Sequence, residues 1–326
     1  MGDPAGIGPE IILKAQAALA GRGPAIVAVG DLAVFRAAAE TLGLEAPCAV
    51  DDPATGGDAS ALAVFEPDTC CTAPVVPGTP DPAHAGAVMA AIETGVALCR
   101  EGRARALVTA PISKAVLYEA GFRFPGHTEY LAELTADLPV DGPRGPAMML
   151  SGGGLRVVLV TIHMPLRAAI EAVTGERIAH VSRLTDHALR RDFGLAAPRL
   201  GLAGLNPHAG EGGALGREEI EIVNPAAQAL RADGIAITDA LPPDTMFHAE
   251  ARAQYDAAVC LYHDQGLIPV KTLDFHGGVN ITLGLPIVRT SPDHGTAFAL
   301  AGRGEARPDS LIAAIREAHA IAEQRG

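Results

Sequence analysis

Short aliphatic runs alternate with alanine-rich stretches along this chain, and this alternation constrains the fold more than any other feature. Runs with the length and residue types of buried strands lie at 25–30, 105–109, 155–162, 199–205 and 257–262. Stretches of helical period lie at 10–20, 84–101, 175–193, 217–232 and 308–325, with Pro225 predicted to kink or break the fourth of them. This order predicts an α/β fold, with a mainly parallel sheet covered by helices.

Length and charge narrow the class further. A chain of 326 residues predicts two domains of ordinary size, because single cores stop growing before about 250–300 residues. The net charge of −13 argues against nucleic acid and anionic membranes as partners, since both bind through excess Lys and Arg. Five cysteines without a C-x-x-C pair fit reduced thiols in the cytoplasm.

The N-terminal segment MGDPAGIGPE has neither the basic region nor the apolar stretch of a signal peptide, and no run along the chain is apolar over the ~18 residues of a membrane span. We therefore expect a soluble cytoplasmic protein. The segment looks like a Gly/Pro loop that leads into a helix. A loop of this kind normally follows a strand, but no strand precedes it in this sequence. A longer natural N-terminus or a trimmed chain would explain this.

Three histidines stand at the ends of three predicted strands. His163 closes LRVVLVTI, His208 follows RLGLAGLNP, and His263 follows AAVCLY. A single loop histidine is usually solvated or hydrogen-bonded. In open α/β sheets, however, ligands bind outside the carboxyl ends of the strands. Three imidazoles at that edge are what a three-histidine metal site with open positions requires.

The loop LNPHAGEGG, at 205–213, permits two interpretations. Its glycines suit a phosphate cradle made of backbone, whereas its histidine suits a metal ligand at the rim of a sheet. No lysine follows the glycines, and two other strands end in histidine. We therefore favour the metal ligand, with the bare loop giving His208 and a substrate room to approach one ion.

Another group of residues suits an anion. His127 and Thr128, in PGHTEYLAEL, stand at a predicted helix start, where free N–H groups favour negative charge, although an ordinary N-cap is equally consistent. Lys271, Asn280 and Arg289 lie in a Gly-punctuated segment, where they point either into a cleft or into salt bridges. A small dianionic or phosphorylated substrate would suit this set.

Familiar cofactor and nucleophile motifs are absent. The glycines of GDPAGIGPE do not form G-x-G-x-x-G, no Gly-Lys-Ser/Thr ends a Gly-rich loop, and no G-x-S-x-G elbow occurs.

Taken in order, several segments resemble the 4-hydroxythreonine-4-phosphate dehydrogenases, NAD-dependent enzymes of pyridoxal phosphate biosynthesis. They are GDPAGIGPE, PGHTE, the His163 segment, GLNPHAGEGG, LPPDTMF, YHDQGLIPVK, GVNITLGLPIVRTSPDHGTA and AGRG. The resemblance implies two α/β/α domains around a cleft, similar to isocitrate and isopropylmalate dehydrogenases, in a homodimer with a shared active site. We place the first, cofactor-side domain at 1–128 with 285–326. The second, at 129–284, carries the metal ligands and the dimer contacts.

The resemblance also implies roles for individual residues. His163, His208 and His263 would hold one divalent metal, Zn, Co or Mg, with His263 taken as the one that reaches the site of the partner subunit. The substrate would contact the five residues of the anion set, namely His127, Thr128, Lys271, Asn280 and Arg289. NAD or NADP would contact His294, Gly295 and Thr296, and Lys271 and Asp244 are candidates for the group that takes the alcohol proton.

The implied reaction oxidises 4-phosphooxy-L-threonine to 2-amino-3-oxo-4-phosphooxybutanoate, which decarboxylates to 3-amino-2-oxopropyl phosphate. Relatives with the same three histidines oxidise threonate or erythronate 4-phosphates, or aromatic cis-dihydrodiols. The phosphate-suited residues argue against the dihydrodiols and leave the sugar-acid phosphates as an alternative. A metal-dependent lyase or hydrolase, and a metal- or anion-binding protein without catalysis, are rival hypotheses.

Overall fold

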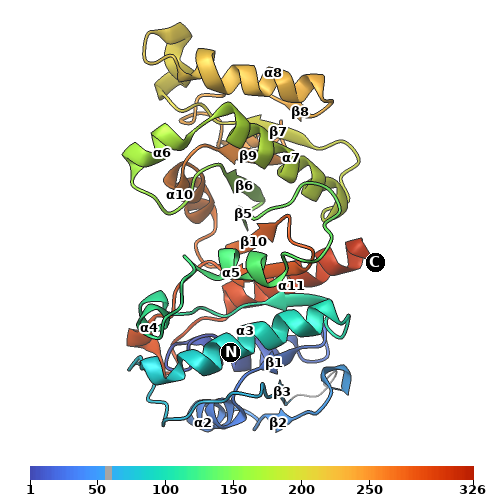
Figure 1. Ribbon diagram of the computed structural model, residues 1–326, viewed down its shortest axis with the longest axis vertical. Coiled ribbons are helices and arrows are strands. Elements are labelled where there is room, and N and C mark those ends of the chain that lie inside the picture. Colours follow the sequence, from blue (N-terminus) through green and yellow to red (C-terminus); the bar gives the residue numbers. More distant parts are fainter. Residues whose placement is uncertain (56–60) are drawn as a thin grey trace. The chain divides into compact units, whose positions relative to one another are not determined.

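The computed structural model describes residues 1–55 and 61–326 and divides them into two compact units. Unit 1 comprises 1–138 and 287–322, and unit 2 comprises 139–286 and 323–326. Both consist of strands covered by helices (Figure 1). The predicted α/β class is confirmed.

The first change of unit falls after Leu138, ten residues later than the predicted boundary at 128. Helix α5 (His127–Leu134) and its end pack within unit 1. Arg100 of α3 (Ala85–Arg100) forms a two-pronged ion pair with Asp137 at 2.7 Å, and the Tyr130 hydroxyl donates to Glu93. These contacts hold α5 and its end against α3.

Unit 1 contains a three-stranded parallel sheet of order β1-β3-β2 and a parallel pair, β4 and β11. The strands are β1 (Val27–Val29), β2 (Cys48–Ala49), β3 (Ala63–Phe65), β4 (Ala106–Val108) and β11 (Val288–Pro292). The helices are α1 (Gly8–Leu19), α2 (Leu32–Leu42), α3, α4 (Lys114–Glu119), α5 and α11 (Asp309–Arg325), with short 3₁₀ turns at Pro53–Thr55, Pro82–His84 and Phe298–Leu300.

Local chemistry sets the helix ends in unit 1. Asp31 caps α2 by accepting the backbone N–H groups of Ala33 and Val34, and Gly43 ends the helix with φ 62°, a conformation that glycine adopts without strain. The segment Pro82–Arg100 is, among the described residues, the one helix long and apolar enough to cross a membrane. Half of its most apolar window is buried inside the structure, as in the core helix of a folded domain.

Unit 2 has six strands in the order β10-β5-β6-β9-β7-β8. They are β5 (Ala147–Gly152), β6 (Leu155–Leu159), β7 (Arg199–Leu202), β8 (Ala236–Ile237), β9 (Ala257–Cys260) and β10 (Val279–Leu283). The helices are α6 (Leu166–Ala172), α7 (Gly175–Arg191), α8 (Asn224–Ala232), α9 (Ala249–Arg252) and α10 (His263–Leu273), with a 3₁₀ segment at Pro207–Gly213 and a π-helix at Glu219–Val223. Helices α7 and α10 lie on either side of β6 and β9 (Figure 1).

The expectation of a mainly parallel sheet is only partly correct for unit 2. Strand β5 runs antiparallel to both β6 and β10, and neither β5 nor β10 was predicted. Gly153 and Gly154, at φ 58° and 76°, form the two-residue connection of the β5–β6 hairpin, a sequence signal that Gly-Gly carries. The helix does not break at Pro225: the π-helix at Glu219–Val223 passes directly into α8 at Asn224, and Val223 and Asn224 both have helical dihedral angles. Pro225 stands in the first turn of α8, where its missing N–H is tolerated.

Candidate active site

The three histidines follow three neighbouring parallel strands of unit 2. Strand β9 lies between β6 and β7, with Leu159 aligned to Cys260 and Leu202 to Val259. Carboxyl ends of parallel strands meet at one edge of a sheet, so the segments that carry His163, His263 and His208 all leave the sheet at that edge. This is the edge predicted for them.

Two buried polar side chains cross-link these strand ends. The Thr161 hydroxyl donates to the Leu261 carbonyl at 2.8 Å, which joins the ends of β6 and β9. Gln265 accepts the Leu261 N–H at 2.7 Å and donates to the Gly204 carbonyl at 2.6 Å, which joins the ends of β9 and β7. Both side chains are almost completely buried, so the edge that carries the histidines is held in register.

His163 and His263 lie side by side within one chain. Their ring centroids are 5.5 Å apart and their planes are inclined by 44°. Two imidazoles on one tetrahedral ion, with metal–nitrogen bonds of ~2.1 Å, have centroids roughly 5 Å apart. His263 Nδ1 is 2.7 Å from Asp264 Oδ1, which leaves Nε2 directed away from that carboxylate. The pair therefore suits two ligands of one metal ion.

His208 lies in a loop of unusual backbone conformation. His208, Ala209 and Glu211 all have positive φ, as do Gly210 and Gly212 between and after them. Side chains rarely adopt this conformation, so other contacts must hold it. Among the described residues no group of three or more His, Cys, Asp or Glu side chains is arranged to hold a metal. The structure thus brings His163 to His263 within one chain and does not bring His208 to them.

Buried Glu219 anchors the His208 loop. One of its carboxylate oxygens accepts the backbone N–H groups of Leu205 and Asn206 at 2.7 and 2.8 Å. The other accepts the Asn206 amide at 2.9 Å, and a Cβ at Gly210 would lie 2.6 Å from it. Sequence reasoning missed this residue, because Glu219 stands among the charged residues Arg217, Glu218 and Glu221 and nothing in the sequence marks it as the buried one.

In unit 1, two positively charged side chains, Arg289 and Lys114, lie close to His127, the first residue of α5. Its pKa is lowered well below the ordinary value, first by burial of the ring and then by Arg289, the Met1 ammonium and Lys114. Arg289 is buried and donates to the Thr109 hydroxyl at 2.7 Å, and burial lowers the pKa of its guanidinium to about 10. A buried guanidinium beside a neutral imidazole favours an anionic ligand.

Two further residues, Thr128 and Lys114, lie close to His127, and we call these two with His127 and Arg289 the cationic group. Thr128 is half-buried in the first turn of α5, as predicted for a residue at a helix start. Lys114 was missed by the sequence reasoning. Its ammonium would lie 3.4 Å from a Cβ added at Gly126, so the glycine before α5 permits its approach.

The remaining predicted substrate and proton-transfer residues belong to unit 2. Asn280 lies on β10, and its buried Oδ1 accepts no hydrogen bond from the part of the chain that the structure describes. Lys271 is in the last turn of α10, with its ammonium 5.8 Å from the Phe275 ring centroid. Asp244 is exposed in the loop between β8 and α9.

The predicted cofactor segment, His294 to Thr296, follows β11 in unit 1. The Thr296 carbonyl accepts the Ile7 N–H at 3.0 Å, and a Cβ at Gly6 would lie 3.0 Å from the same oxygen. The segment therefore rests against the GDPAGIGPE loop, and Gly6 allows that contact.

Comparison with known proteins points to one family. The family model described as pyridoxal phosphate biosynthetic protein PdxA matches residues 23–318. The chain is 67% identical over 346 aligned positions to a protein of Maricaulis maris named 4-hydroxythreonine-4-phosphate dehydrogenase, covering 100% of this chain and 97% of the relative.

Two solved structures share the whole fold. The crystal structure of 4-hydroxythreonine-4-phosphate dehydrogenase from Klebsiella pneumoniae is 41% identical, with a TM-score of 0.87 over 99% of this chain and 96% of that one. The terephthalate 1,2-cis-dihydrodiol dehydrogenase from Burkholderia xenovorans is 31% identical, with a TM-score of 0.65 over 98% and 95%.

The fold and site define an α/β enzyme with an imidazole pair at the carboxyl ends of its strands and a buried cationic group. The likeness to both dehydrogenases places it in their structural class. The chain belongs to the family of the pyridoxal phosphate biosynthetic protein PdxA.

Proposed function

We propose that this chain is a metal-requiring, NAD(P)-dependent dehydrogenase that oxidises 4-phosphooxy-L-threonine. The product, 2-amino-3-oxo-4-phosphooxybutanoate, loses carbon dioxide to give 3-amino-2-oxopropyl phosphate, a step toward pyridoxal phosphate. The observation that carries the proposal is the pairing of His163 with His263 at adjacent strand ends, in a chain of the PdxA family.

The substrate phosphate is assigned to the cationic group of unit 1. A phosphate dianion would accept hydrogen bonds from the buried Arg289 guanidinium, and neutral His127 with Thr128 would donate further ones. Lys114 adds charge without the planar geometry of arginine. In unit 2, Lys271 and Asn280 orient the polar groups near the reacting carbon, with the buried Asn280 oxygen accepting from the substrate.

His163, His208 and His263 would hold one divalent cation, and the centroid distance of the first and third fits shared ligation. When bound to neutral imidazoles, such a cation supplies a Lewis acid that lowers the pKa of a secondary alcohol and stabilises the negative charge left by decarboxylation. Zn, Co and Mg are the candidates. Lys271 and Asp244 are the candidate proton acceptors, and His294, Gly295 and Thr296 are assigned to the nicotinamide cofactor.

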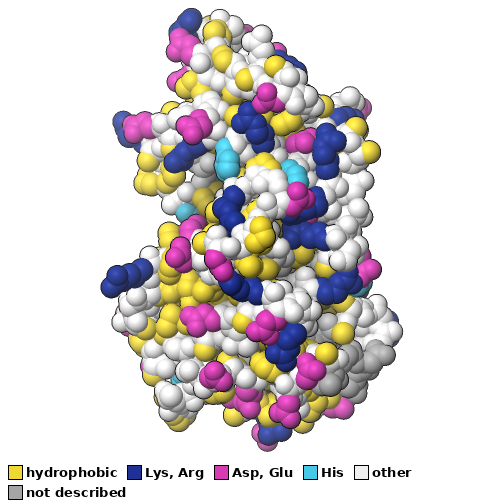
Figure 2. All heavy atoms as spheres, turned by 45° about the vertical axis from the view of Figure 1, so that its right-hand side comes forward, with side chains coloured by type: hydrophobic (Ala, Val, Ile, Leu, Met, Phe, Trp, Pro, Cys, Tyr) yellow, Lys and Arg dark blue, Asp and Glu magenta, His cyan; other side chains and the backbone are white. Residues whose placement is uncertain are grey.

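We further propose that the enzyme is a homodimer that shares its active site. Large apolar side chains stay exposed on α6 and α10 and in the residues next to these helices, and burial against a second copy would remove them from water. They are Met164, Leu166, Ile170, Ile268, Leu273 and Phe275. On the face shown in Figure 2, hydrophobic side chains and a few histidines lie among scattered side chains of both charges. The free cysteines suit the reducing cytoplasm.

A substrate panel tests the assignment. The purified chain with a divalent metal and NAD or NADP should reduce the nucleotide and release carbon dioxide from 4-phosphooxy-L-threonine. Turnover of threonate or erythronate 4-phosphate alone would assign the alternative substrate class. Activity without a nicotinamide cofactor would indicate a lyase or hydrolase. If the chain shows no turnover and the cofactor causes no thermal shift, only a binding function remains.

Replacement of one histidine tests the metal site. His208→Ala should abolish metal-dependent turnover and reduce the metal content, while the thermal midpoint stays near that of the parent protein, because the loop side chain is not part of the core. His180→Ala, on the exposed face of α7, is the matched control and should change neither. Normal metal content and rate in His208→Ala would contradict the ligand assignment.

Mixed dimers decide which histidines act together. If His163 and His263 of one chain serve one site, dimers of His163→Ala with His263→Ala have no intact site and stay inactive. If His263 serves the partner's site, as the family resemblance implied, those dimers regain up to one intact site. Dimers of His208→Ala with His263→Ala should regain activity where His208 comes from the other subunit, and verified heterodimers without recovery would exclude that sharing.

A further inference from the structure

Lysine is scarce in this chain. Lys14, Lys114 and Lys271 are its only lysines among 25 lysine and arginine residues. The ε-amine of lysine condenses with carbonyl compounds to form an imine, a reaction in which arginine does not replace it. The surroundings of each lysine therefore decide where such a reaction can occur.

Two of the three lysines are poorly placed for it. Lys14 Nζ donates to the Glu10 carboxylate at 2.7 Å and to the carbonyls of Gly304 and Ala306 at 2.8 and 2.7 Å. All three of its N–H bonds are therefore used. Lys271 lies on α10 in unit 2, so it is not part of the cationic group of unit 1.

Lys114 has different surroundings. It is the exposed first residue of α4, and its ammonium forms no ion pair or hydrogen bond with any residue that the structure describes. Its Nζ would lie 3.4 Å from a Cβ added at Gly126, the residue before α5, and its charge acts on His127. An accessible amine therefore stands beside the start of α5, where the substrate phosphate is assigned.

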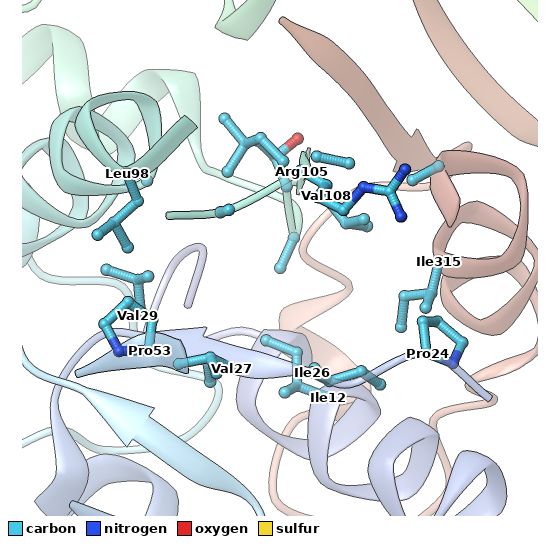
Figure 3. Close-up of a pocket in the computed structure, with 18 of the residues that line it drawn as sticks. Ile12, Pro24, Ile26, Val27, Val29, Pro53, Leu98, Arg105, Val108 and Ile315 are labelled. Carbon is cyan, nitrogen blue, oxygen red and sulfur yellow. The ribbon is translucent and has the colours of Figure 1, made fainter. Parts of the chain in front are cut away.

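His127 also borders a cavity of about 500 Å³ in unit 1, but this cavity does not suit an anion. Its walls are mainly aliphatic, with Ile12, Val27 and Val108 among the lining residues (Figure 3). Removing a phosphate from water into apolar surroundings is strongly unfavourable. A phosphate that binds His127 is therefore expected to contact the cationic group and not the cavity.

Glu129 provides a carboxylate near the Lys114 amine. Its Oε2 would lie 3.6 Å from the same added Cβ at Gly126, and its charge also acts on Arg289. Through one water molecule, such a carboxylate can take a proton from an ammonium group and return it to a departing hydroxyl. Imine formation requires both transfers.

We propose that Lys114 is a site of reversible imine formation with small phosphorylated aldehydes, an inference that rests on the phosphate site proposed above. The phosphate binds Arg289, His127 and Thr128. The Lys114 ammonium gives one proton to the carboxylate, and the neutral amine attacks the aldehyde carbon. The carbinolamine then loses one water as the proton returns, and a C=N bond replaces the C=O bond without oxidation or reduction. The bound aldehyde occupies the phosphate site and excludes the substrate.

The test uses glyceraldehyde 3-phosphate as the probe and glyceraldehyde as the matched compound without phosphate. Cyanoborohydride reduces any imine on the whole chain to a stable secondary amine, and peptide mass spectrometry measures the label on each lysine. Lys114 should carry about tenfold more label than Lys14 or Lys271. Glyceraldehyde should label it about tenfold more slowly, because it lacks the charge-assisted hydrogen bonds of the phosphate, and inorganic phosphate should protect it.

Three variants locate the reaction. Lys114→Arg should remove the label from its peptide while keeping the positive charge. Glu129→Gln should slow the labelling of Lys114 about tenfold or more, because the amide cannot take the proton. Glu119→Gln, at the exposed end of α4, is the matched control and should label at the rate of the parent chain.

The outcomes are distinct. Equal labelling of the three lysines, preferential labelling of Lys271, or labelling that inorganic phosphate does not reduce would each overturn the proposal. The reaction needs neither a metal nor a nicotinamide cofactor. A chain that turns over 4-phosphooxy-L-threonine but is not labelled at Lys114 would therefore overturn this inference alone, whereas phosphate-dependent labelling of Lys114 without turnover would support it and overturn the proposed function.

Discussion

Glu219→Ala tests whether one buried carboxylate holds the loop of His208, a proposed metal ligand. The carboxylate accepts two backbone N–H groups, from Leu205 and Asn206, at the base of the loop that carries His208. Leaving a buried N–H without an acceptor costs about 1–3 kcal/mol, and two of them give about 2–6 kcal/mol before water enters the space. We expect a loss of about 3 kcal/mol in the free energy of unfolding.

The same substitution should weaken metal binding. The positive φ values at His208 and Ala209 are unfavourable for side chains, so a loop without its anchor relaxes to conformations that withdraw the imidazole. A tenfold weaker metal affinity corresponds to about 1.4 kcal/mol. Denaturant unfolding measures the first effect, and competitive titration with a metal chelator measures the second.

Glu221→Ala is the matched control for Glu219→Ala. Glu221 lies in the same π-helical segment, but its ion pair with Arg217 is more than half exposed, so we expect a change under about 0.5 kcal/mol and normal metal affinity. If Glu219→Ala loses stability but binds metal as the parent does, the carboxylate has no role in presenting His208. An unchanged stability would refute the hydrogen-bond reasoning itself.

Three further predictions follow from buried polar groups. Burial alone would raise the pKa of Asp192, but hydrogen bonds from Arg325 and Arg191 outweigh burial and lower this pKa. Asp192→Asn should therefore reduce the free energy of unfolding by about 2 kcal/mol at neutral pH. In urea titrations, the difference between the two proteins should vanish as the pH falls through the lowered pKa. Gln265→Ala should cost about 2–4 kcal/mol in the same assay, since it severs the ends of β9 and β7, and a neutral result would contradict the cross-link. Arg289→Lys should raise the KM for a phosphorylated substrate at least tenfold in steady-state assays, because lysine cannot reproduce the planar donor array, and an unchanged KM would remove Arg289 from the phosphate site.

The antiparallel part of unit 2 shows where local sequence reasoning stops. Strand β10 begins more than 120 residues after β5 ends, and no local pattern reveals that the two pair. Gly153-Gly154 is a sequence signal for the β5–β6 hairpin, whereas no signal in the sequence indicates that β10 pairs with the other edge of β5. Pairing between distant strands depends on which buried faces pack against each other. The periodicity of one segment does not indicate its partner strand.

Sequence alone determined the α/β class, the helices α1, α3, α7, α8 and α11, and the position of each histidine after a strand, because hydrophobic periodicity and turn residues act over a few neighbouring positions. It did not reveal α2, α6 or α10. Tertiary structure alone decided that β9 lies between β6 and β7, and therefore that His163 meets His263 in one chain. It also decided that Glu219 anchors the loop of His208, that Lys114 lies close to His127, and that residues of β1 and β4 line one cavity. These contacts join residues far apart in the chain, and only the packing of the folded chain brings them together.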